Sequence, residues 1–497
     1  MNIARSRRAA ERHAPQELPL SPRGSARGLP SQTGCSDRDR RSRFSRSERP
    51  EGRGEGAALL TYRVETWGCQ MNVLDGERMA GQLEQRGMRP AQGSDPADVV
   101  ILNTCAVREK AEAKVYSALG VLGRRKQDSP DLVIGVTGCV AQIQGKEILE
   151  RAPWVDFVLG TGNVERLGEV VERVRAERRR VSALELPHES PIYQFRQIAR
   201  GSPFQAYVTV IEGCSQFCTF CIVPFTRGRE RSRASSEIFE EMRSLVGRGS
   251  MEITLLGQTV NAYRDPEEGF GFGELLRRAA AIPGVKRLRF LTSHPRFLDD
   301  SMIEAIAAGG TVAPYLHVPA QSGSDRVLYR MKRRYTTAEY LEKVGRIRRA
   351  LPPIAISSDF IVGFPGETEE DFADTLALVR EARFSNVFAF RYSARPGTAA
   401  ARWGSDAAVP EEVAAERLAR ILALQEELQE RTNESLVGRE LEILVEGAGK
   451  DGRMRGRTPC NRIAHVDGEG RSMKPGDYVR VRITRGLPNS LRAEVAA

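Results

Sequence analysis

From about residue 61 onward, short apolar runs alternate with amphipathic patterns along the chain. The runs YRVETWGCQ, DVVILNTCAV and LVIGVTGCVAQ each lead through a polar turn into a helical pattern, such as VLDGERMAGQLEQRG after the first. Strands that alternate with helices in this way form a parallel sheet covered by helices on both faces. We therefore expect a doubly wound α/β domain over residues 59–185.

A second series of the same kind follows a charged stretch, residues 186–202, that we interpret as a linker. Six apolar runs, from FQAYVTVIEG to NVFAFRYS, are separated by helical patterns such as SSEIFEEMRSLVGRG. About six β/α units fit a (β/α) barrel or part of one, with functional residues at the carboxyl ends of the strands. We assign a partial (β/α)6 barrel and a final long helix to residues 203–436.

The pattern is different at the two ends of the chain. After residue 436, short strands and glycine turns, as in RELEILVEGAGKDGRMRG, predict a small antiparallel, OB-like β-barrel over residues 437–497. Residues 1–58 are rich in Arg, Ser, Gly and Pro and lack aliphatic periodicity, which predicts a disordered basic arm. Acidic residues in the arm argue against a transit peptide, and a start site assigned too early is a further alternative.

Charge is distributed unevenly over the 497 residues, whose formal net charge is +10. The arm holds 13 Arg against 7 acids, the terminal barrel 12 Lys/Arg against 8 acids, and residues 59–436 hold 50 of each. The excess at the carboxyl end suits a nucleic-acid partner. No run approaches the roughly 18 apolar residues that a membrane helix needs, so we expect a soluble, cytoplasmic protein.

Three cysteines lie close together after the first strand of the second series. In EGCSQFCTFCIVPF, Cys214, Cys218 and Cys221 have the spacing C-x3-C-x2-C. Three thiolates in one short loop suit a four-iron cluster, one iron of which then has no protein ligand. Zinc is the less favoured alternative, because no fourth Cys or His lies nearby in the sequence.

Three further cysteines occupy equivalent positions in the first domain. Cys69, Cys105 and Cys139 each follow a predicted parallel strand, at separations of 36 and 34 residues. Because ligands of open α/β sheets bind beyond the carboxyl ends of the strands, these thiols can converge on a second cluster. Three unrelated core cysteines are the alternative. Cys35 and Cys460 have no partner at such a spacing, and we interpret both as incidental.

The loop C-x3-C-x-F-C at the end of the first strand resembles the radical S-adenosylmethionine superfamily. In that superfamily, S-adenosylmethionine binds the open iron, and its reductive cleavage releases a 5′-deoxyadenosyl radical. Together with the second cysteine set, the domain order resembles the methylthiotransferase family over about residues 61–493. This resemblance implies two 4Fe-4S clusters, of which the one on Cys69, Cys105 and Cys139 provides sulfur. One S-adenosylmethionine supplies the methyl group and another the radical, and an electron donor such as flavodoxin or ferredoxin is required.

Two strings, GCQMN around Cys69 and CTFCIVPFTRGRERSR, resemble the branch of the family that modifies dimethylallyladenosine in tRNA, with Gln70 as the most informative residue. The resemblance implies methylthiolation of adenine carbon 2 in an isopentenyl-modified adenosine beside the anticodon. Threonylcarbamoyladenosine in tRNA or a ribosomal-protein aspartate is the alternative substrate. A non-enzymatic alternative is an iron–sulfur protein that binds RNA or senses redox state.

The resemblance also implies contacts to S-adenosylmethionine. Polar or Gly/Pro clusters follow several strands, in LLGQTVNAY, TSHP, VPAQSGS and SSDFIVGFPGETEEDF. The residues that we assign to cofactor binding are Phe220, Gln258, Asn261, Ser293, Gln321, Ser322 and Asp359. Turn formation, helix capping or core packing is the alternative explanation for each.

Basic residues complete the set of candidates. The terminal barrel resembles the RNA-binding module called TRAM, which implies contacts to the tRNA backbone. The residues assigned to those contacts are Arg453, Arg455, Arg457, Arg462, Lys474, Arg480, Arg482 and Arg485. The runs at 227–233 and 330–334 flank the expected mouth of the central barrel, where they can meet phosphates, although such runs are often solvated faces.

Overall fold

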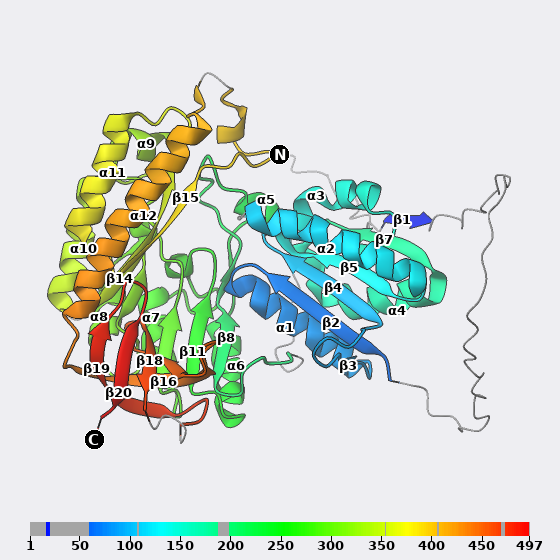
Figure 1. The fold of residues 1–497 in the computed structure, drawn as a ribbon, viewed down its shortest axis with the longest axis horizontal. Helices are drawn as coiled ribbons and strands as arrows, with labels where there is room; N and C mark the ends of the chain where they lie inside the picture. The colour runs from blue at the N-terminus through cyan, green and yellow to red at the C-terminus, as the bar shows by residue number, and fades with distance from the viewer. Residues whose placement is uncertain are drawn as a thin grey trace, which may run out of the picture.

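Three folded units follow one another along the chain in the computed structural model (Figure 1). The structure describes residues 16–19, 59–106, 109–186, 198–352, 354–404, 407–468 and 473–496; for 16–19 and 109–112 it describes the backbone alone. Within these ranges, no helix has the length and apolar character needed to cross a membrane.

The first unit is a seven-stranded sheet with helices on both faces. Its strand order is β1-β7-β6-β5-β4-β2-β3, and every pairing is parallel except that of β1 with β7. The strands are β1 (Gln16–Pro19), β2 (Thr61–Trp67), β3 (Arg89–Pro90), β4 (Val99–Thr104), β5 (Val133–Thr137), β6 (Phe157–Leu159) and β7 (Arg179–Ala183). The doubly wound domain predicted from the sequence is confirmed.

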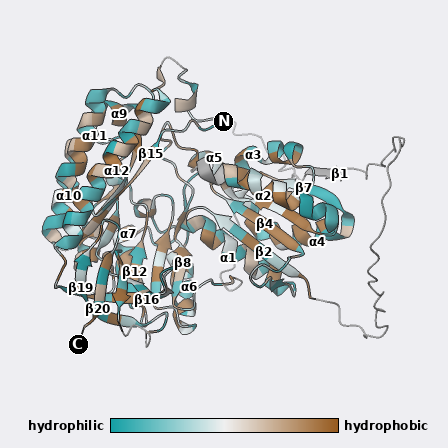
Figure 2. Ribbon diagram, viewed as in Figure 1, coloured by the Kyte–Doolittle hydropathy of each residue, from teal (hydrophilic) through white to brown (hydrophobic). Residues whose placement is uncertain are grey.

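Helices cover this sheet in two pairs that bury its apolar strands (Figure 2). One face packs α2 (Glu109–Asp128) and α3 (Gly138–Arg151), and the other packs α1 (Gln70–Gln85) and α4 (Leu167–Glu177), which follows the 3-10 turn η1 (Thr161–Arg166). Strand β1 belongs to the arm expected to lack structure, so that expectation does not hold for these four residues. The rest of the arm lies outside the described residues.

The central unit contains two three-stranded parallel sheets, ordered β12-β11-β8 and β13-β14-β15. A parallel bridge between Leu288 and Val312 joins the two sheets, so the six strands form the partial barrel that the sequence predicts. The strands are β8 (Gln205–Thr209), β11 (Glu252–Leu256), β12 (Arg287–Phe290), β13 (Tyr315–His317), β14 (Ala355–Val362) and β15 (Asn386–Arg391).

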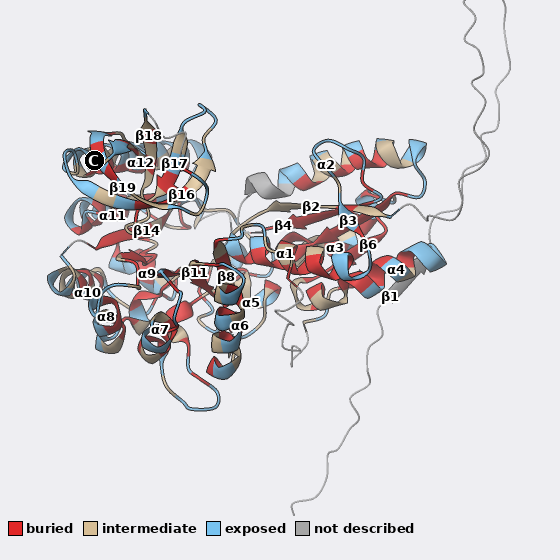
Figure 3. Ribbon diagram, turned by 90° about the horizontal axis from the view of Figure 1, so that it is seen from below, coloured by how far each residue is buried: buried red, intermediate tan, exposed pale blue. Residues whose placement is uncertain are grey.

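Helices surround the outer face of the partial barrel (Figures 1 and 3). They are α6 (Ser235–Gly247), α7 (Phe272–Ala280), α8 (Asp300–Ala307), α10 (Thr337–Ala350), α11 (Glu369–Ala382) and α12 (Glu411–Glu434). Two short helices lie elsewhere: α5 (Val223–Thr226) follows the cysteine loop and contacts α3, and α9 (Asp325–Arg330) packs with Phe364 and Ala400 in a separate cluster. Short elements at the strand ends are β9 (Ile211–Glu212), β10 (Arg231–Ser232), η3 (Val260–Ala262), η4 (Pro295–Phe297) and η5 (Ala400–Arg402). Thr368 is the N-cap of α11 and forms a capping box with Asp371.

Strand register determines which residues face the interior of the partial barrel. On β14, Ile356, Phe360 and Val362 pack into the helix-covered core. The alternate positions Ser357, Asp359 and Ile361 therefore face inward, and their neighbours on β15 are Asn386, Phe388 and Phe390. Phe388 and Phe390 are 43% and 41% exposed, so the inner face of β15 presents aromatic side chains to an open interior.

The third unit is a closed five-stranded barrel, as predicted, in the order β16-β17-β18-β20-β19. Its strands are β16 (Glu440–Ala448), β17 (Met454–Arg457), β18 (Ile463–Asp467), β19 (Tyr478–Gly486) and β20 (Leu491–Val495). Arg289 of β12 donates hydrogen bonds to the carbonyls of Thr458 (2.8 Å) and Pro459 (2.9 Å), which follow β17. The terminal barrel thus packs against the base of the central strands rather than at their carboxyl ends.

The first two units meet across an apolar contact. Met71 and Leu74 of α1 pack against Leu256 of β11, with Cys69 and Leu291 at the edge of the same cluster. Because α1 starts at the carboxyl end of β2, this contact turns the cysteine-bearing edge of the first sheet toward the carboxyl ends of the central strands.

Candidate functional site

The structure brings the three cysteines of the first domain together. Cys69 caps the start of α1, Cys105 follows β4, and Cys139 lies in the first turn of α3. Cys105 hydrogen-bonds to Cys69, and the charges of Cys69 and Cys139 act on each other. Three sulfur atoms from three parallel strand ends therefore meet at one edge of the sheet.

Local sequence explains how the backbone delivers two of these thiols. Gly138, directly before Cys139, has φ +87°, and a Cβ there would lie 2.5 Å from the carbonyl oxygen of Thr104, so only glycine fits. Asn72 accepts a hydrogen bond from Cys69 Sγ at 3.3 Å, and Asn103 donates to the Asn72 carbonyl at 2.7 Å. The paired amides thus fix the start of α1 to the end of β4.

The electrostatic environment differs between these thiols. The hydrogen bond from Cys105, together with the positive charge of Arg227 and the N–H groups of Met71 and Asn72, outweighs burial and lowers the pKa of Cys69 to about 5. Burial raises the pKa of Cys139, although Arg227 opposes the shift. Arg227 therefore acts on two of the three sulfur atoms.

The second set lies on the loop after β9. Gly213, before Cys214, has φ +74°, and a Cβ there would lie 2.2 Å from the carbonyl oxygen of Arg229. The Cys221 amide donates to the Cys218 carbonyl at 3.0 Å, which folds the loop so that the three thiols face one another. Burial and the nearby Cys218 raise the pKa of Cys221 to about 12, and burial also raises that of Cys214.

A buried arginine contacts this second set. Arg333 donates to Cys218 Sγ at 3.5 Å and to the Pro319 carbonyl at 2.9 Å. Its neighbours Lys332 and Arg334 have φ +57° and +58°, a left-handed pair that turns the Arg333 side chain inward. The sequence suggested a phosphate contact for this run; the burial of Arg333 corrects that interpretation for this residue.

Both cysteine sets fit a four-iron cluster. Each offers three sulfur donors, the ligand type that iron–sulfur clusters use. Across the described ranges, no three His, Cys, Asp or Glu side chains converge on a single ion. In a four-iron cluster each cysteine binds a different iron. The three cysteines of a set can therefore hold a cluster although they do not converge on a single metal ion.

Two residues assigned to S-adenosylmethionine have polar atoms in need of a partner. Gln258 Oε1, after β11, and Ser293 Oγ, after β12, are buried and make no hydrogen bond within the described part of the chain. Unpaired buried polar atoms are uncommon because each costs free energy, so they indicate a ligand-binding position. Both follow strands of the same sheet at its carboxyl end, so they fit the polar parts of this cofactor.

Two other assigned residues are engaged elsewhere. Asn261 donates to the His294 carbonyl (3.0 Å) and accepts from the His294 amide (2.8 Å), so its amide joins two loops. Ser322 Oγ lies 3.4 Å from Thr375 Oγ1 of α11 and accepts from the Ser324 amide at 3.2 Å. These hydrogen bonds fit the alternative roles in turns and packing, and the cofactor contacts of Asn261 and Ser322 stay a prediction.

The remaining candidates line or support the barrel interior. Phe220 packs edge to face on Phe364, with ring centroids 6.4 Å apart. Gln321 has φ +72° and its backbone pairs with β14. Asp359 Oδ2 lies 3.4 Å from His317 Nε2, and His317 Nδ1 lies 2.8 Å from Ser357 Oγ. His317 and its aromatic neighbour Phe388, at 6.0 Å, carry no motif by which the sequence marks them.

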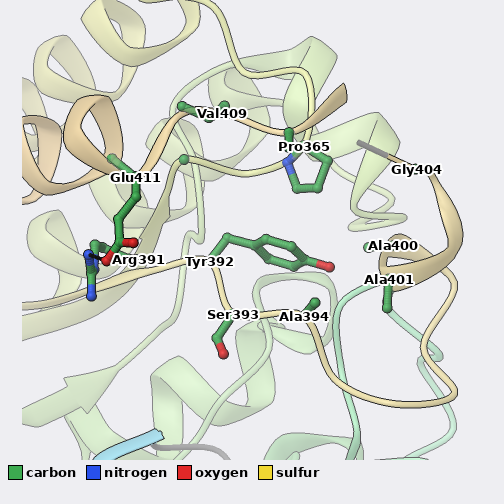
Figure 4. Close-up of a pocket in the computed structure, with 13 residues that line it drawn as sticks. Pro365, Arg391, Tyr392, Ser393, Ala394, Ala400, Ala401, Gly404, Val409 and Glu411 are labelled. Carbon is green, nitrogen blue, oxygen red and sulfur yellow. Dashed lines mark hydrogen bonds and ion pairs between the residues drawn. The ribbon is translucent and has the colours of Figure 1, made fainter. Parts of the chain in front are cut away.

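A cavity of about 370 Å³ lies between the end of β15 and the start of α12 (Figure 4). Tyr392 extends across it with the hydroxyl directed toward Ala400 and Ala401, and this hydroxyl has no hydrogen-bond partner in the described structure. The Ala400 amide donates to the Thr219 carbonyl within the cluster loop. Gly363 and Pro365, from the stretch SSDFIVGFPGETEEDF, line the cavity.

The arginines assigned to RNA differ in their availability. Arg453, Arg455, Arg457 and Arg482 each lie within 4 Å of a carboxylate. Two glutamates of β16, Glu440 and Glu446, are the partners of the last three of these arginines. Arg462 is turned inward and donates to Asn433 Oδ1 at 2.9 Å, where burial lowers its pKa. Contacts of these five residues to the tRNA backbone stay a prediction, and they would have to compete with these protein partners. The exposed residues of the set without an ion pair among the described residues are Lys474, Arg480 and Arg485.

The run at 227–233 is likewise engaged with protein groups. Arg227 pairs with Asp75 at 2.7 Å, and Arg229 lies over the Phe217 ring at 5.7 Å. Arg231 lies 3.5 Å from Glu212, and Arg233 lies 2.8 Å from Glu241. The burial of Arg227 and Arg233 corrects the phosphate-binding interpretation for these two residues, and for Arg229 and Arg231 it stays a prediction.

Comparison with sequence families gives three matches that correspond to the three units. Residues 61–160 match the family described as uncharacterized protein family UPF0004. Residues 208–379 match the radical SAM superfamily, and residues 434–496 match the TRAM domain.

Similar proteins cover most of the chain. Proteins named tRNA-2-methylthio-N(6)-dimethylallyladenosine synthase from Thermobifida fusca (47% identity, 87% of this chain and 89% of that protein) and Cereibacter sphaeroides (48%, 87% and 97%) are among them. Among solved structures, the radical S-adenosylmethionine methyltransferase TsrM from Kitasatospora setae, with cobalamin and a [4Fe-4S] cluster bound, has a TM-score of 0.50 at 15% identity. It covers 69% of this chain and 74% of that one. This likeness supports the fold alone.

Proposed function

The chain belongs to the family of tRNA-2-methylthio-N(6)-dimethylallyladenosine synthases, and from this membership we propose that it methylthiolates carbon 2 of an isopentenyl-modified adenine in tRNA. The observation that carries the proposal is that each α/β unit brings three cysteines together at the carboxyl ends of its strands, on either side of the contact between α1 and β11. A single-cluster radical enzyme has no need of the first set.

We propose that Cys214, Cys218 and Cys221 hold the cluster that binds S-adenosylmethionine, while the first domain's set holds an auxiliary cluster. When bound, these groups supply a 5′-deoxyadenosyl radical, a methyl group and the inserted sulfur. Ser293 and Gln258 offer their unpaired polar atoms to S-adenosylmethionine. Arg333 holds Cys218 from within the barrel and fixes the position of this loop.

The inner face of β15 supports a position for the target adenine. Phe388 and Phe390 give it an exposed aromatic surface, and Asp359 with His317 presents polar groups beside it. Bases taken out of a stack bind proteins by stacking on aromatic rings and by hydrogen bonds at their edges. We therefore propose that the base enters the barrel interior along β15, between the two cysteine sites.

The terminal barrel would hold the tRNA backbone mainly through Lys474, Arg480 and Arg485, which are exposed on and beside β19. Phosphate contacts of this kind position the RNA without reading its sequence. A one-electron donor of the flavodoxin or ferredoxin type and a cytoplasmic location complete the proposal.

Iron content tests the two-cluster arrangement. Anaerobically reconstituted protein should contain about eight irons per chain, and replacing Cys69, Cys105 and Cys139 by Ala should leave about four. Replacing Cys105 alone and replacing Cys460 alone provide a matched pair, because Cys460 lies outside both sets and its replacement should leave the iron content unchanged. Four irons before and after the triple replacement would rule out the auxiliary cluster.

Nucleosides from a deletion strain test the substrate. Digested tRNA from that strain should lack 2-methylthio-isopentenyladenosine and accumulate isopentenyladenosine. Unchanged methylthio-isopentenyladenosine together with loss of methylthio-threonylcarbamoyladenosine would instead assign the alternative tRNA substrate.

A further inference from the structure

One side chain of the central unit is buried among the cysteines of the first unit. Arg227 lies six positions after Cys221 on the chain, yet its side chain, only 8% exposed, reaches into the first domain. It pairs with Asp75 of α1 at 2.7 Å and hydrogen-bonds to Cys139, and its charge also acts on Cys69. The loop that carries one cysteine set thus places a cation against the other set.

Among the described residues, Asp75 is one of two partners of this cation, the other being the Cys139 sulfur. Asp75 already pairs with Arg78 of its own helix at 3.2 Å, and Arg78 in turn contacts Glu165 and Glu212. Arg78 is thus shared among three carboxylates, and Asp75 is in turn shared between Arg78 and Arg227. A buried guanidinium requires compensation for its lost hydration, and the neighbouring sulfur atoms supply negative charge once they are thiolates.

Arginine is suited to this position for two reasons. Its charge does not depend on pH in the physiological range, and its planar fork donates to two acceptors at once. Here the fork meets a carboxylate on one side and a sulfur on the other. A fixed positive charge beside an iron–sulfur cluster favours the reduced, more negative form, since hydrogen bonds to the sulfur atoms and nearby charge set the potential.

We propose that Arg227 is a positioning residue for the auxiliary cluster: the radical-generating domain provides this guanidinium to the sulfur ligands of the first domain, which raises the reduction potential of that cluster. The inference rests on the auxiliary cluster of the proposed function. It assigns a role to a residue that belongs to neither cysteine set and whose sequence neighbourhood, TRGRERSR, resembles a phosphate-binding run.

The test uses the full chain with Cys214, Cys218 and Cys221 replaced by Ala, so that only the auxiliary cluster assembles. A redox titration monitored by electron paramagnetic resonance then compares Arg227→Gln, Arg227→Lys and Asp75→Asn in this background. Arg229→Gln is the matched control, because that guanidinium lies over Phe217, two positions along the same loop.

Arg227→Gln removes the cation and should lower the ratio of reduced to oxidised cluster by about tenfold at a fixed potential. For a one-electron couple this corresponds to a midpoint potential lower by about 59 mV. Asp75→Asn removes a negative charge from the same group and should shift the midpoint upward. Arg227→Lys should stay closer to the parent than Arg227→Gln does, and Arg229→Gln should match the parent. Opposite shifts at positions 227 and 75 distinguish an electrostatic role from a general loosening of the fold.

An unchanged midpoint in Arg227→Gln at full iron occupancy would overturn the proposal, as would shifts of the same sign in Arg227→Gln and Asp75→Asn. If Arg227→Gln assembles less iron than the parent, the midpoint potential of Asp75→Asn decides. An upward shift of that potential supports the role of charge, and an unchanged or lower potential contradicts it. Absence of iron from the parent background would instead refute the auxiliary cluster itself, which separates failure of the proposed function from failure of this inference.

Discussion

In each cysteine site a glycine directly precedes a cysteine, and the backbone conformation of that glycine explains why no other residue fits there. At Gly138 and Gly213 the backbone is left-handed and a side chain would collide with a carbonyl oxygen. The cysteine that follows each glycine is thereby turned toward the carboxyl ends of the strands. Substituting either glycine by alanine would displace the thiol as well as strain the backbone.

Ser293 and Ser322 form a matched pair for testing cofactor contact. Ser293→Ala removes a hydroxyl that has no partner in the described structure, so we expect unchanged stability but roughly 3- to 10-fold weaker binding of S-adenosylmethionine, the worth of one hydrogen bond. Ser322→Ala should lower stability by about 1 kcal/mol and leave that binding unchanged, because its hydroxyl serves α11 and Ser324. Equilibrium binding and unfolding measurements on both variants check this. Equal effects of the two substitutions on binding would contradict the assignment of Ser293.

His294 predicts a dependence of stability on pH. Burial, reinforced by Arg333 and other cations, lowers its pKa from 6.5 to about 2, so it stays neutral when folded. Because the unfolded chain takes up the proton below about pH 6.5, folding stability from this group is complete above that pH and is lost as pH falls. Between pH 7 and pH 5 the loss is about 2 kcal/mol.

Denaturant unfolding at pH 7 and pH 5 measures this effect. His294→Gln should reduce the pH dependence by about the same 2 kcal/mol, because the variant has no imidazole to protonate. Other titrating groups are common to both proteins and cancel in the comparison. The same pH dependence in variant and parent would show that His294 is not held neutral.

At the scale of elements, the alternation of side chains along β14 and β15 separates structure from function. Outward residues such as Phe360 and Val387 join the helix-covered core, whereas inward Asp359, Phe388 and Phe390 remain accessible. A strand at the edge of an open barrel can therefore be apolar on both faces for two different reasons. One face stabilises the unit, and the other is available to a planar ligand.

Phe388→Ala tests the inner face. We expect affinity for an isopentenyl-modified anticodon stem-loop to fall by about 10- to 100-fold, the usual contribution of one base stacked on an aromatic ring, while S-adenosylmethionine binding is retained. Tyr329→Ala is the control, since that ring is 86% exposed on α9 and has no place in the proposed site. Loss of S-adenosylmethionine binding with unchanged stem-loop affinity would assign this surface to the cofactor instead.

Sequence patterns predicted the elements well because the strands are apolar and the helices amphipathic. The hydrophobic pattern of each segment therefore shows which of its residues are buried. They also placed the cysteines, because strand ends are visible in the sequence. Contacts between distant segments were not predictable in this way. Arg227 and Arg333 look like solvated cations in the sequence, and only the fold shows that one reaches Asp75 and the other Cys218. Asn261 and Ser322 look like ligand-binding residues for the converse reason: the partners that occupy them lie about 30 to 50 positions away.

At the scale of the whole molecule, the terminal barrel is more closely integrated than its small size suggests. Arg287 and Arg289 are buried at the base of the central strands and donate to carbonyls of residues 457–459. Deleting the terminal barrel would leave these guanidinium groups without those acceptors and expose apolar surface. Surface substitutions therefore test its role in tRNA binding better than truncation does.

Charge substitutions on this barrel should distinguish free from paired cations. Replacing Lys474, Arg480 and Arg485 by Gln should reduce the slope of log affinity for tRNA against log salt by about 2 to 3, roughly one for each lost phosphate contact. The control replaces Arg453, Arg455 and Arg482, each of which lies within 4 Å of a carboxylate, and should change the slope less. Measuring tRNA affinity over a range of salt concentrations gives the slope for each variant. A larger change of slope in the control variant would assign the phosphate contacts to Arg453, Arg455 and Arg482 instead.

The central claim is that two cysteine sites act together on one modified adenine. The most direct test is an anaerobic assay of reconstituted protein with a reductant, S-adenosylmethionine and a synthetic isopentenyl-modified anticodon stem-loop, in which 5′-deoxyadenosine and digested nucleosides are both quantified. The parent should form 5′-deoxyadenosine and 2-methylthio-isopentenyladenosine, and the variant lacking Cys69, Cys105 and Cys139 should form 5′-deoxyadenosine without the methylthio product. Methylthio product from that variant, or 5′-deoxyadenosine without methylthio product from a parent with both clusters loaded, would contradict the account.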